Sequence, residues 1–219
     1  MIKTNRSLVN LKLRRYDEVL LDTISTPASE MSETCILRAV LAYHGLSRFQ
    51  NCHDSLEVLL HKYHDRPMAN QEFSRVWYRL REQSSGEYDF KSMYEATNTM
   101  PLSFDNATYV GPIEVKDSEG RGKGLFTTRD VNVGELLLCE KAFSHCYADE
   151  SGESAYRIGT FMDTNTSQVT VGTEGYLITE IVQQLQRNPS QIPDFLSLYR
   201  GSYQSVGVAQ VDGKPIIDT

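Results

Sequence analysis

The sequence has few cysteines, no long apolar run and no excess of basic residues. No apolar stretch approaches the roughly twenty residues that cross a bilayer, so we expect no membrane contact. A formal net charge of -7 argues against direct binding to nucleic acid backbones. The four cysteines form no Cys-x-x-Cys pair, which argues against a disulfide scaffold or a four-thiolate zinc site: Cys35, Cys52, Cys139 and Cys146. These absences predict an intracellular protein, cytoplasmic or nuclear, with reduced thiols.

The chain is long enough for one large or two modest globular domains, with 219 residues of which 40% are hydrophobic. Its composition changes at residues 84–86 and again at 98–101, and polar residues continue up to Tyr109. We therefore predict an N-terminal domain at 1–100, a linker at 101–109 and a second domain at 110–219.

Residues 5–83 place apolar side chains three and four positions apart, as amphipathic helices do. The segment Leu-Arg-Arg-Tyr at 13–16 returns 33 residues later as Leu-Ser-Arg-Phe at 46–49. That period is typical of tetratricopeptide-like helix-turn-helix arrays, whose repeat is about 34 residues. The first unit is degenerate, because it has Arg6 where a small residue is expected and Asn10 in place of an aromatic one. We expect the second unit to pack through Ala39, Tyr43, Phe49, Cys52, Leu56 and Leu59, and a third helix at 68–83 to follow the helix breaker at 66–67.

Such arrays bind peptides on their concave surface, so a protein or peptide partner is predicted for the helical part. Basic side chains there would bind carboxylates, or they are simply solvated helix faces: Arg14, Arg15, Arg48, Lys62 and Arg66. His61 and His64 share a helix face, with His53 two turns earlier, but no carboxylate or thiolate completes a set of ligands at matching spacing. We therefore predict no metal site.

The second half alternates between β and helical patterns. Residues 109–115 alternate as a short strand, residues 125–128 and 136–139 flank a turn at Gly134, and residues 135–140 form a buried apolar run. Helical spacing follows at 172–187 until Asn188-Pro189 ends it, and a second short helix is predicted at 190–199. The fold class is therefore α+β.

Residues 117–138 contain Arg121-Gly122-Lys123-Gly124-Leu125 and then Val-Gly-Glu-Leu at 133–136. This stretch resembles the opening of a SET domain. Because Gly122 and Gly124 lack a Cβ, they can adopt positive φ and let a ligand lie against the main chain. The resemblance implies that residues 121–125 contact S-adenosylmethionine, the backbone holding its amino-acid end and the basic side chains its carboxylate. The alternative is that the glycines only form the turn of a β domain.

The whole chain is similar to proteins that join tetratricopeptide-like repeats to a SET domain, a fungal-type arrangement allied to the SET and MYND methyltransferases. In that family residues 148–203 would be a helical insertion within the SET domain. The Asn-His-x-Cys stretch and the C-terminal tyrosine of the family do not occur in this sequence, nor do the zinc ligands of a MYND finger. We therefore expect an incomplete protein-lysine methyltransferase homologue, truncated before the second half of its SET domain, and assign no catalytic residue. The alternatives are a peptide-binding scaffold without catalysis and an unrelated β-clip module that shares only the hairpin.

Overall fold

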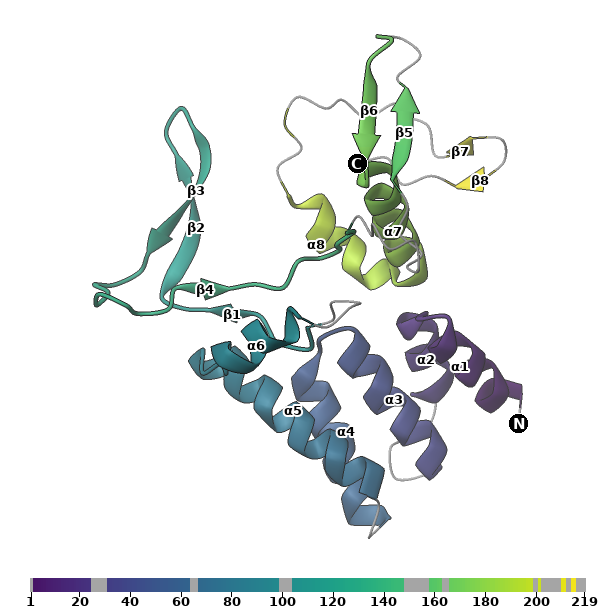
Figure 1. Ribbon diagram of the computed structural model, residues 1–219. Helices are drawn as coiled ribbons and strands as arrows, with labels where there is room; N and C mark the ends of the chain where they lie inside the picture. Colours follow the sequence, from purple (N-terminus) through teal and green to yellow (C-terminus); the bar gives the residue numbers. More distant parts are fainter. Residues whose placement is uncertain are drawn as a thin grey trace.

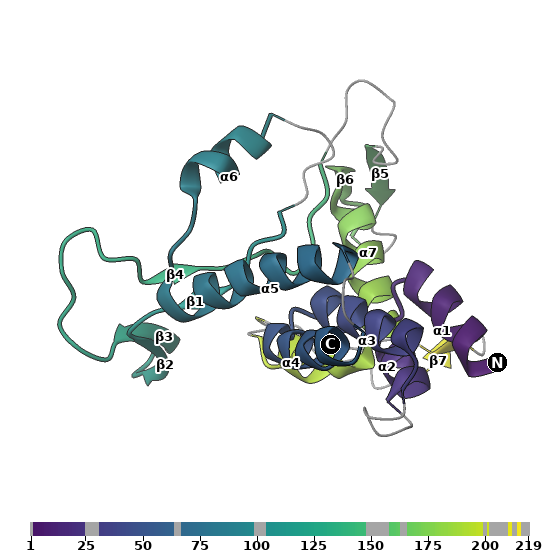
Figure 2. The same ribbon diagram turned by 90° about the horizontal axis from the view of Figure 1, so that it is seen from below.

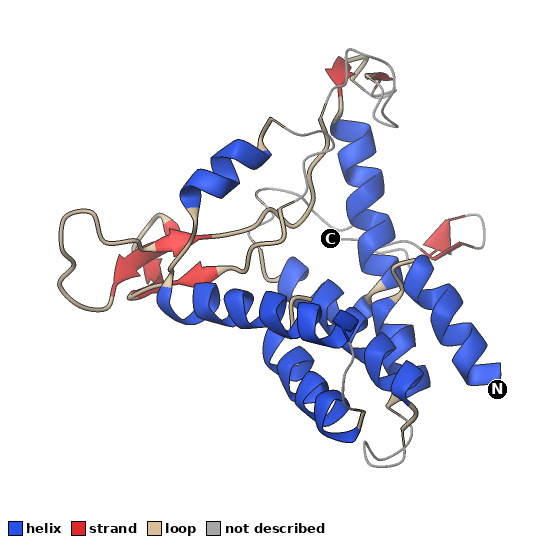
Figure 3. Ribbon diagram, turned by 60° about the horizontal axis from the view of Figure 1, so that its bottom comes forward, coloured by secondary structure: helices blue, strands red, loops and turns tan. Residues whose placement is uncertain are grey.

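The computed structural model describes residues 2–24, 31–63, 67–98, 104–147, 158–162, 166–198, 201, 210–211 and 214–215. Helices form the body of the molecule and small antiparallel sheets lie at its margins (Figures 1 and 3), which confirms the α+β class. The elements follow in the order α1 (Ile2–Lys12), α2 (Tyr16–Thr23), α3 (Glu33–Gly45), α4 (Phe49–Lys62), α5 (Pro67–Ser85), α6 (Phe90–Ala96), β1 (Tyr109–Val110), β2 (Ile113–Ser118), β3 (Gly122–Thr127), β4 (Leu138–Cys139), β5 (Gly159–Met162), β6 (Val169–Gly172), α7 (Glu174–Arg187), η1 (Pro189–Gln191), α8 (Ile192–Leu196), β7 (Gln210–Val211) and β8 (Lys214–Pro215).

The first two helical hairpins repeat with an offset of 33 residues. Arg14 and Ser47 occupy equivalent positions in the turns and both have positive φ, 56° and 57°. In each turn the next residue donates its backbone N–H to a carbonyl five residues earlier, Arg15 to Asn10 and Arg48 to Tyr43, both at 2.9 Å. The predicted helix-turn-helix period is therefore present in the structure, while membership of the tetratricopeptide family stays a prediction.

The core of the stack lies where the helices meet. One cluster surrounds the α3–α4–α5 contacts, and a smaller one joins α2 to α3 around Val19 and Ala39. The contacts expected of the second unit are found: Tyr43 is partly buried, and the others are buried at Ala39, Phe49, Cys52, Leu56 and Leu59. The helix predicted at 68–83 is α5, which begins at Pro67. Proline is suited to this position because the first N–H of a helix has no partner within the helix. The helix ends before Gly86, which has a φ of 68°.

A polar network takes the place of apolar packing in the degenerate first unit. The carboxylate of Asp22 has a side chain only 1% exposed and accepts hydrogen bonds from Arg6 Nε at 2.8 and 3.0 Å. Asn10 Nδ2 donates to the same carboxylate at 3.5 Å. The hydrogen bond from Arg6 holds the pKa of Asp22 below its usual value. Of the two residues that depart from the repeat pattern, Arg6 thus neutralises a buried acid and Asn10 donates a hydrogen bond to it.

The β segments differ from the sequence prediction in their pairing. The single strand predicted at 109–115 is interrupted at Pro112, which has no N–H to donate, so β1 and β2 belong to different sheets. β1 pairs with β4, Tyr109 opposite Cys139, and β2 pairs with β3. The strand predicted at 136–139 is limited to Leu138–Cys139, and Leu138 is exposed rather than buried. It therefore does not lie beside β3 as a wall of the glycine loop.

The region predicted as a helical insertion, 148–203, also contains strands, and this part of the prediction was wrong. β5 and β6 form an antiparallel hairpin with Gly159 opposite Gly172. β-branched residues at Thr160, Val169 and Val171 favour extended backbone there. The predicted helices are found as α7 and, in shorter form, as η1 and α8, whereas residues 148–157 lie outside the described residues.

The end of α7 docks on the turn between α1 and α2. Asn188 is 3% exposed, and its Oδ1 accepts the backbone N–H of Tyr16 at 2.7 Å while its Nδ2 donates to the carbonyl of Arg14 at 3.1 Å. Asp17 accepts two hydrogen bonds from Ser190, both at 2.8 Å. The N-terminal end of α2, whose first N–H groups lack helical partners, is thereby capped by the C-terminal part of the chain. Among the described helices, none has the length and apolarity needed to cross a bilayer.

Candidate functional site

The predicted cofactor loop forms the tip of the β2–β3 hairpin. Ser118 lies opposite Gly122 at the end of the ladder, and residues 119–121 close the turn. Gly120 and Gly122 have positive φ, 70° and 76°, and a Cβ added at either would meet no atom within 4 Å. Gly124 does not share this conformation, contrary to the prediction, because it is a regular ladder residue opposite Lys116. Its lack of a Cβ instead makes room for the ring of Phe126, 2.9 Å from the ideal Cβ position.

The five predicted contact residues lie together on this hairpin. Arg121, Gly122 and Lys123 are exposed, Gly124 is half-buried, and the side chain of Leu125 is 56% exposed. The hairpin projects away from the helical body in two views (Figures 1 and 2). The residues are therefore accessible to a ligand, but they line an open surface rather than an enclosed pocket.

One face of the hairpin carries an exposed apolar pair. Val115 lies directly opposite Leu125, so their side chains share a face, and Val115 is 65% exposed. A two-stranded hairpin is at best marginally stable in water when nothing covers it. Among the described residues, nothing covers this apolar pair.

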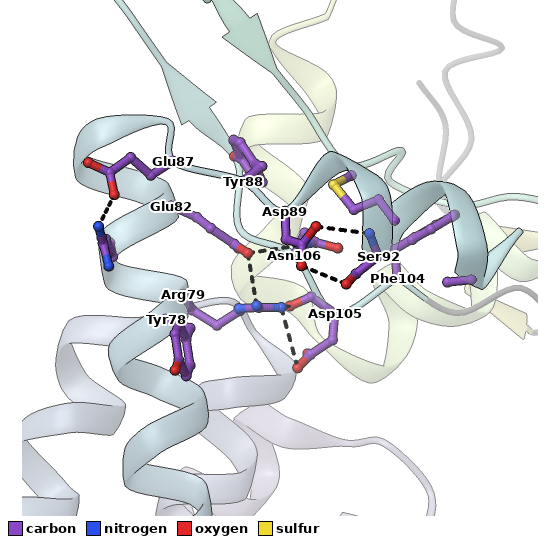
Figure 4. A pocket seen from close by; sticks show the side chains of 13 residues that line it. Tyr78, Arg79, Glu82, Glu87, Tyr88, Asp89, Ser92, Phe104, Asp105 and Asn106 are labelled. Carbon is purple, nitrogen blue, oxygen red and sulfur yellow. Dashed lines mark hydrogen bonds and ion pairs between the residues drawn. The ribbon is translucent and has the colours of Figure 1, made fainter.

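A cavity of about 680 Å³ lies between α5, α6 and the segment 104–106 (Figure 4). No sequence pattern had been assigned to a site here. Aromatic and apolar groups line it together with ionised ones: Tyr78, Arg79, Arg81, Glu82, Glu87, Tyr88, Asp89, Ser92, Met93, Ala96, Phe104, Asp105 and Asn106. Consecutive turns of α5 contribute Arg79 and Glu82 to the same face, which is the helical spacing that could have indicated the site.

The wall of this cavity is held by Glu82, which is 4% exposed. Its carboxylate accepts hydrogen bonds from Arg79 Nη2, Asn106 Nδ2 and the backbone N–H of Ala107, each at 2.8 Å. Arg79 lies between Glu82 and Asp105 and also donates to the carbonyl of Asp105 (Figure 4). The residues 104–107, all of which fall in the linker predicted at 101–109, are thus tightly attached to α5.

Further ionisable groups surround the same segment. Asp105 also accepts a hydrogen bond from Arg75, and His44 Nε2 lies 3.4 Å from its carboxylate. Burial lowers the pKa of His44 and that of Lys141, and the charge of Asp105 acts on both. Tyr88 donates its hydroxyl to the carbonyl of Ala107 at 2.6 Å, and burial raises its pKa. The segment 104–107 is therefore held by a network of charged and hydrogen-bonded groups.

The basic residues predicted to bind carboxylates do not gather on one surface. Arg14, Arg15 and Arg48 are exposed in the two interhelix turns. Lys62 lies at the opposite end of α4, where it donates to the carbonyl of Met31 at 2.9 Å, and a helix of that length separates its ends by about 20 Å. Arg66 lies outside the described residues. A common carboxylate-binding patch is not formed by the four that are described.

The histidine pattern differs from the sequence argument in one respect. Two carboxylates do lie near His53, those of Asp54 at 3.7 Å and Glu57 at 4.0 Å, and the three side chains offer ligand atoms within 4.8 Å of one another. His61 is exposed on the same helix, and His64 is outside the described residues. Exposed acids of this kind are common without an ion, so the group is no more than a weak candidate.

A protein of Gibberella zeae named methyltransferase is similar to this chain. The two are 38% identical over 216 residues, which cover 98% of this chain and 30% of that protein. The chain thus spans less than a third of the length of this curated relative. No family model matches the chain, and no solved structure matches it. The similarity includes both the helical stack and the glycine hairpin, and it supports a link to methyltransferases.

Proposed function

We propose that this chain is part of a SET-type, S-adenosylmethionine-dependent protein-lysine methyltransferase, in which the β2–β3 hairpin forms one wall of the cofactor site. The observation that carries the proposal is the open backbone at Gly122, with φ 76° and no neighbouring atom, between two exposed basic side chains. The similarity over 98% of the chain to a protein named methyltransferase supports the reaction class.

Within this proposal the hairpin binds and orients rather than reacts. Arg121 and Lys123 would pair with the carboxylate at the amino-acid end of the cofactor, and the main chain at Gly122 would approach it closely. The cofactor supplies a methyl group on a sulfonium, and transfer requires a neutral lysine amine held in line with that methyl group. No residue of this chain is assigned to the transfer itself.

The test is calorimetric titration of S-adenosylmethionine into the chain and two matched glycine variants. Gly122→Ala and Gly120→Ala replace residues with nearly the same φ in equally open space, so each carries the same backbone strain, about 1 kcal/mol. We expect Gly122→Ala to weaken binding at least tenfold and Gly120→Ala to leave it within about twofold. Equal effects of the two substitutions would show that the loop does not contact the cofactor.

A second candidate function is a peptide-binding scaffold without catalysis. The packed helical hairpins, which repeat with the predicted period, favour this alternative. Peptide binding by a chain that releases no heat with S-adenosylmethionine would select it over the methyltransferase proposal.

A further inference from the structure

Helix α6 lacks the packing that a short helix needs. It has only seven residues and none of them is buried, and Phe90 and Tyr94 are 55% and 75% exposed. Isolated helices of this length are not stable in water. The space between α6 and α5 is the cavity of about 680 Å³, which α6 lines through Ser92, Met93 and Ala96 (Figure 4). An occupant of that space would provide the missing contacts.

The charge of the cavity wall selects a cation. Four lining side chains are acidic, at Glu82, Glu87, Asp89 and Asp105, and two are basic, Arg79 and Arg81. Arg79 is shared by Glu82 and Asp105, and Arg81 pairs with Glu87. Arg75, which lies outside the lining, also pairs with Asp105, so the excess negative charge of the wall is that of Asp89 alone.

Within the parts of the chain that the structure describes, no cation contacts Asp89, so its negative charge is not cancelled by an ion pair. It caps α6 by accepting from the N–H and the hydroxyl of Ser92, at 2.9 and 2.6 Å. These bonds lower its pKa, so it is ionised at neutral pH. Lys91 on the same helix acts on Asp89 through space but makes its ion pair with Glu95, at 3.9 Å.

The aromatic rings and the size of the cavity favour a peptide over a simple ion. Tyr78, Tyr88 and Phe104 give ring faces of the kind that attract ammonium and guanidinium groups. The cavity of about 680 Å³ is far larger than a single ion needs and lies within the range of ligand-binding pockets. A basic peptide brings a cationic side chain together with enough volume to occupy the space beside α6.

We propose that the cavity between α5 and α6 binds a lysine- or arginine-containing peptide segment, with its cationic side chain against Asp89 and the aromatic wall. The site is separate from the glycine hairpin. Its wall is acidic, whereas the carboxylate-binding surface predicted from the sequence is basic. It does not depend on cofactor binding, so either proposal can fail while the other holds.

The test uses three blocked synthetic peptides in which glycine alternates with lysine, with acetyl-lysine or with glutamate, titrated calorimetrically into the chain. We expect heat only from the lysine peptide. Asp89→Asn removes the charge but keeps the helix cap, because Asn caps as well as Asp. It should weaken binding roughly two- to fivefold, the size of an exposed ion pair. Glu95→Gln, an equal charge change on the same helix outside the cavity, should leave binding unchanged.

Slower amide hydrogen exchange across 90–96 in the presence of the lysine peptide is also expected. Equal weakening by both substitutions would mean diffuse attraction to an acidic surface and would overturn the proposal. Binding of the acetyl-lysine peptide as tightly as the lysine peptide would assign the cavity to an apolar partner instead, and no heat from the lysine peptide at millimolar concentration would remove the site altogether.

Discussion

The helical stack and the β2–β3 hairpin differ in how far their apolar side chains are buried. The stack buries its apolar side chains in two clusters and pairs the buried Asp22 with Arg6. The hairpin leaves Val115 and Leu125 more than half exposed and holds its tip open at Gly122. The stack is therefore built for stability and the hairpin for contact with something else, which is the basis of the cofactor proposal.

The largest expected contrast between the two regions is in the cost of truncating a leucine. Leu56→Ala removes a fully buried side chain of α4 and should lower the free energy of unfolding by about 2–5 kcal/mol. Leu125→Ala removes an exposed one and should cost less than about 0.5 kcal/mol. Urea denaturation followed by circular dichroism measures both. Similar losses would mean that the hairpin is covered in solution and that the contrast is false.

A smaller effect is expected where the C-terminal part joins the stack. Asn188→Ala removes the acceptor for Tyr16 N–H and the donor to the Arg14 carbonyl from a buried position, and should cost about 1–3 kcal/mol. Ser190→Ala, which removes one exposed hydrogen bond to Asp17, is the control and should change stability by less than about 0.5 kcal/mol. If Asn188→Ala melts like the wild type, α7 does not stabilise the first helical hairpin.

The smallest predicted change concerns the acid inside the first hairpin. Asp22→Asn should cost at most about 1 kcal/mol, because its partner Arg6 is 57% exposed and screened by water. The pKa of Asp22 is lowered in the folded protein, so its contribution is complete above the unfolded value of about 3.9 and is lost as the pH falls through the folded one. The stability difference between wild type and Asp22→Asn, measured by thermal melts from pH 7 to pH 2, should vanish at the acid end. Glu18→Gln, an exposed acid of the same helix, should show no such difference at neutral pH.

The sequence predicted the helices up to Ser85 and helix α7 well because their apolar spacing is local, whereas α6 was not predicted. The 33-residue echo at 13–16 and 46–49 marks a backbone turn that the structure repeats hydrogen bond for hydrogen bond. The end of α7 at Asn188 could also be predicted from the sequence, since Pro189 follows it. The hydrogen bonds of Asn188 to the first helical hairpin could not be predicted, because its partners lie 172 and 174 residues away along the chain.

Strand pairing and the second candidate site depended on distant contacts and were missed for that reason. A two-residue strand such as β4 has no periodicity to detect, and its partner β1 lies across the glycine hairpin in the sequence. The cavity is formed by α5, α6 and residues 104–106. Composition alone assigned residues 104–106 to a linker. The glycine pattern at 120–124 did predict a hairpin, but a positive φ at Gly122 and a ladder position at Gly124 look the same in the sequence.

The most direct test of the central claim is amide hydrogen exchange of residues 113–127 with and without S-adenosylmethionine, read by mass spectrometry. The account predicts fast exchange in the free chain, because the hairpin has no covering layer, and clear slowing at 121–125 when the cofactor is added, with α3 and α4 unchanged. Exchange at 121–125 that is identical under both conditions, at cofactor concentrations up to millimolar, would contradict it.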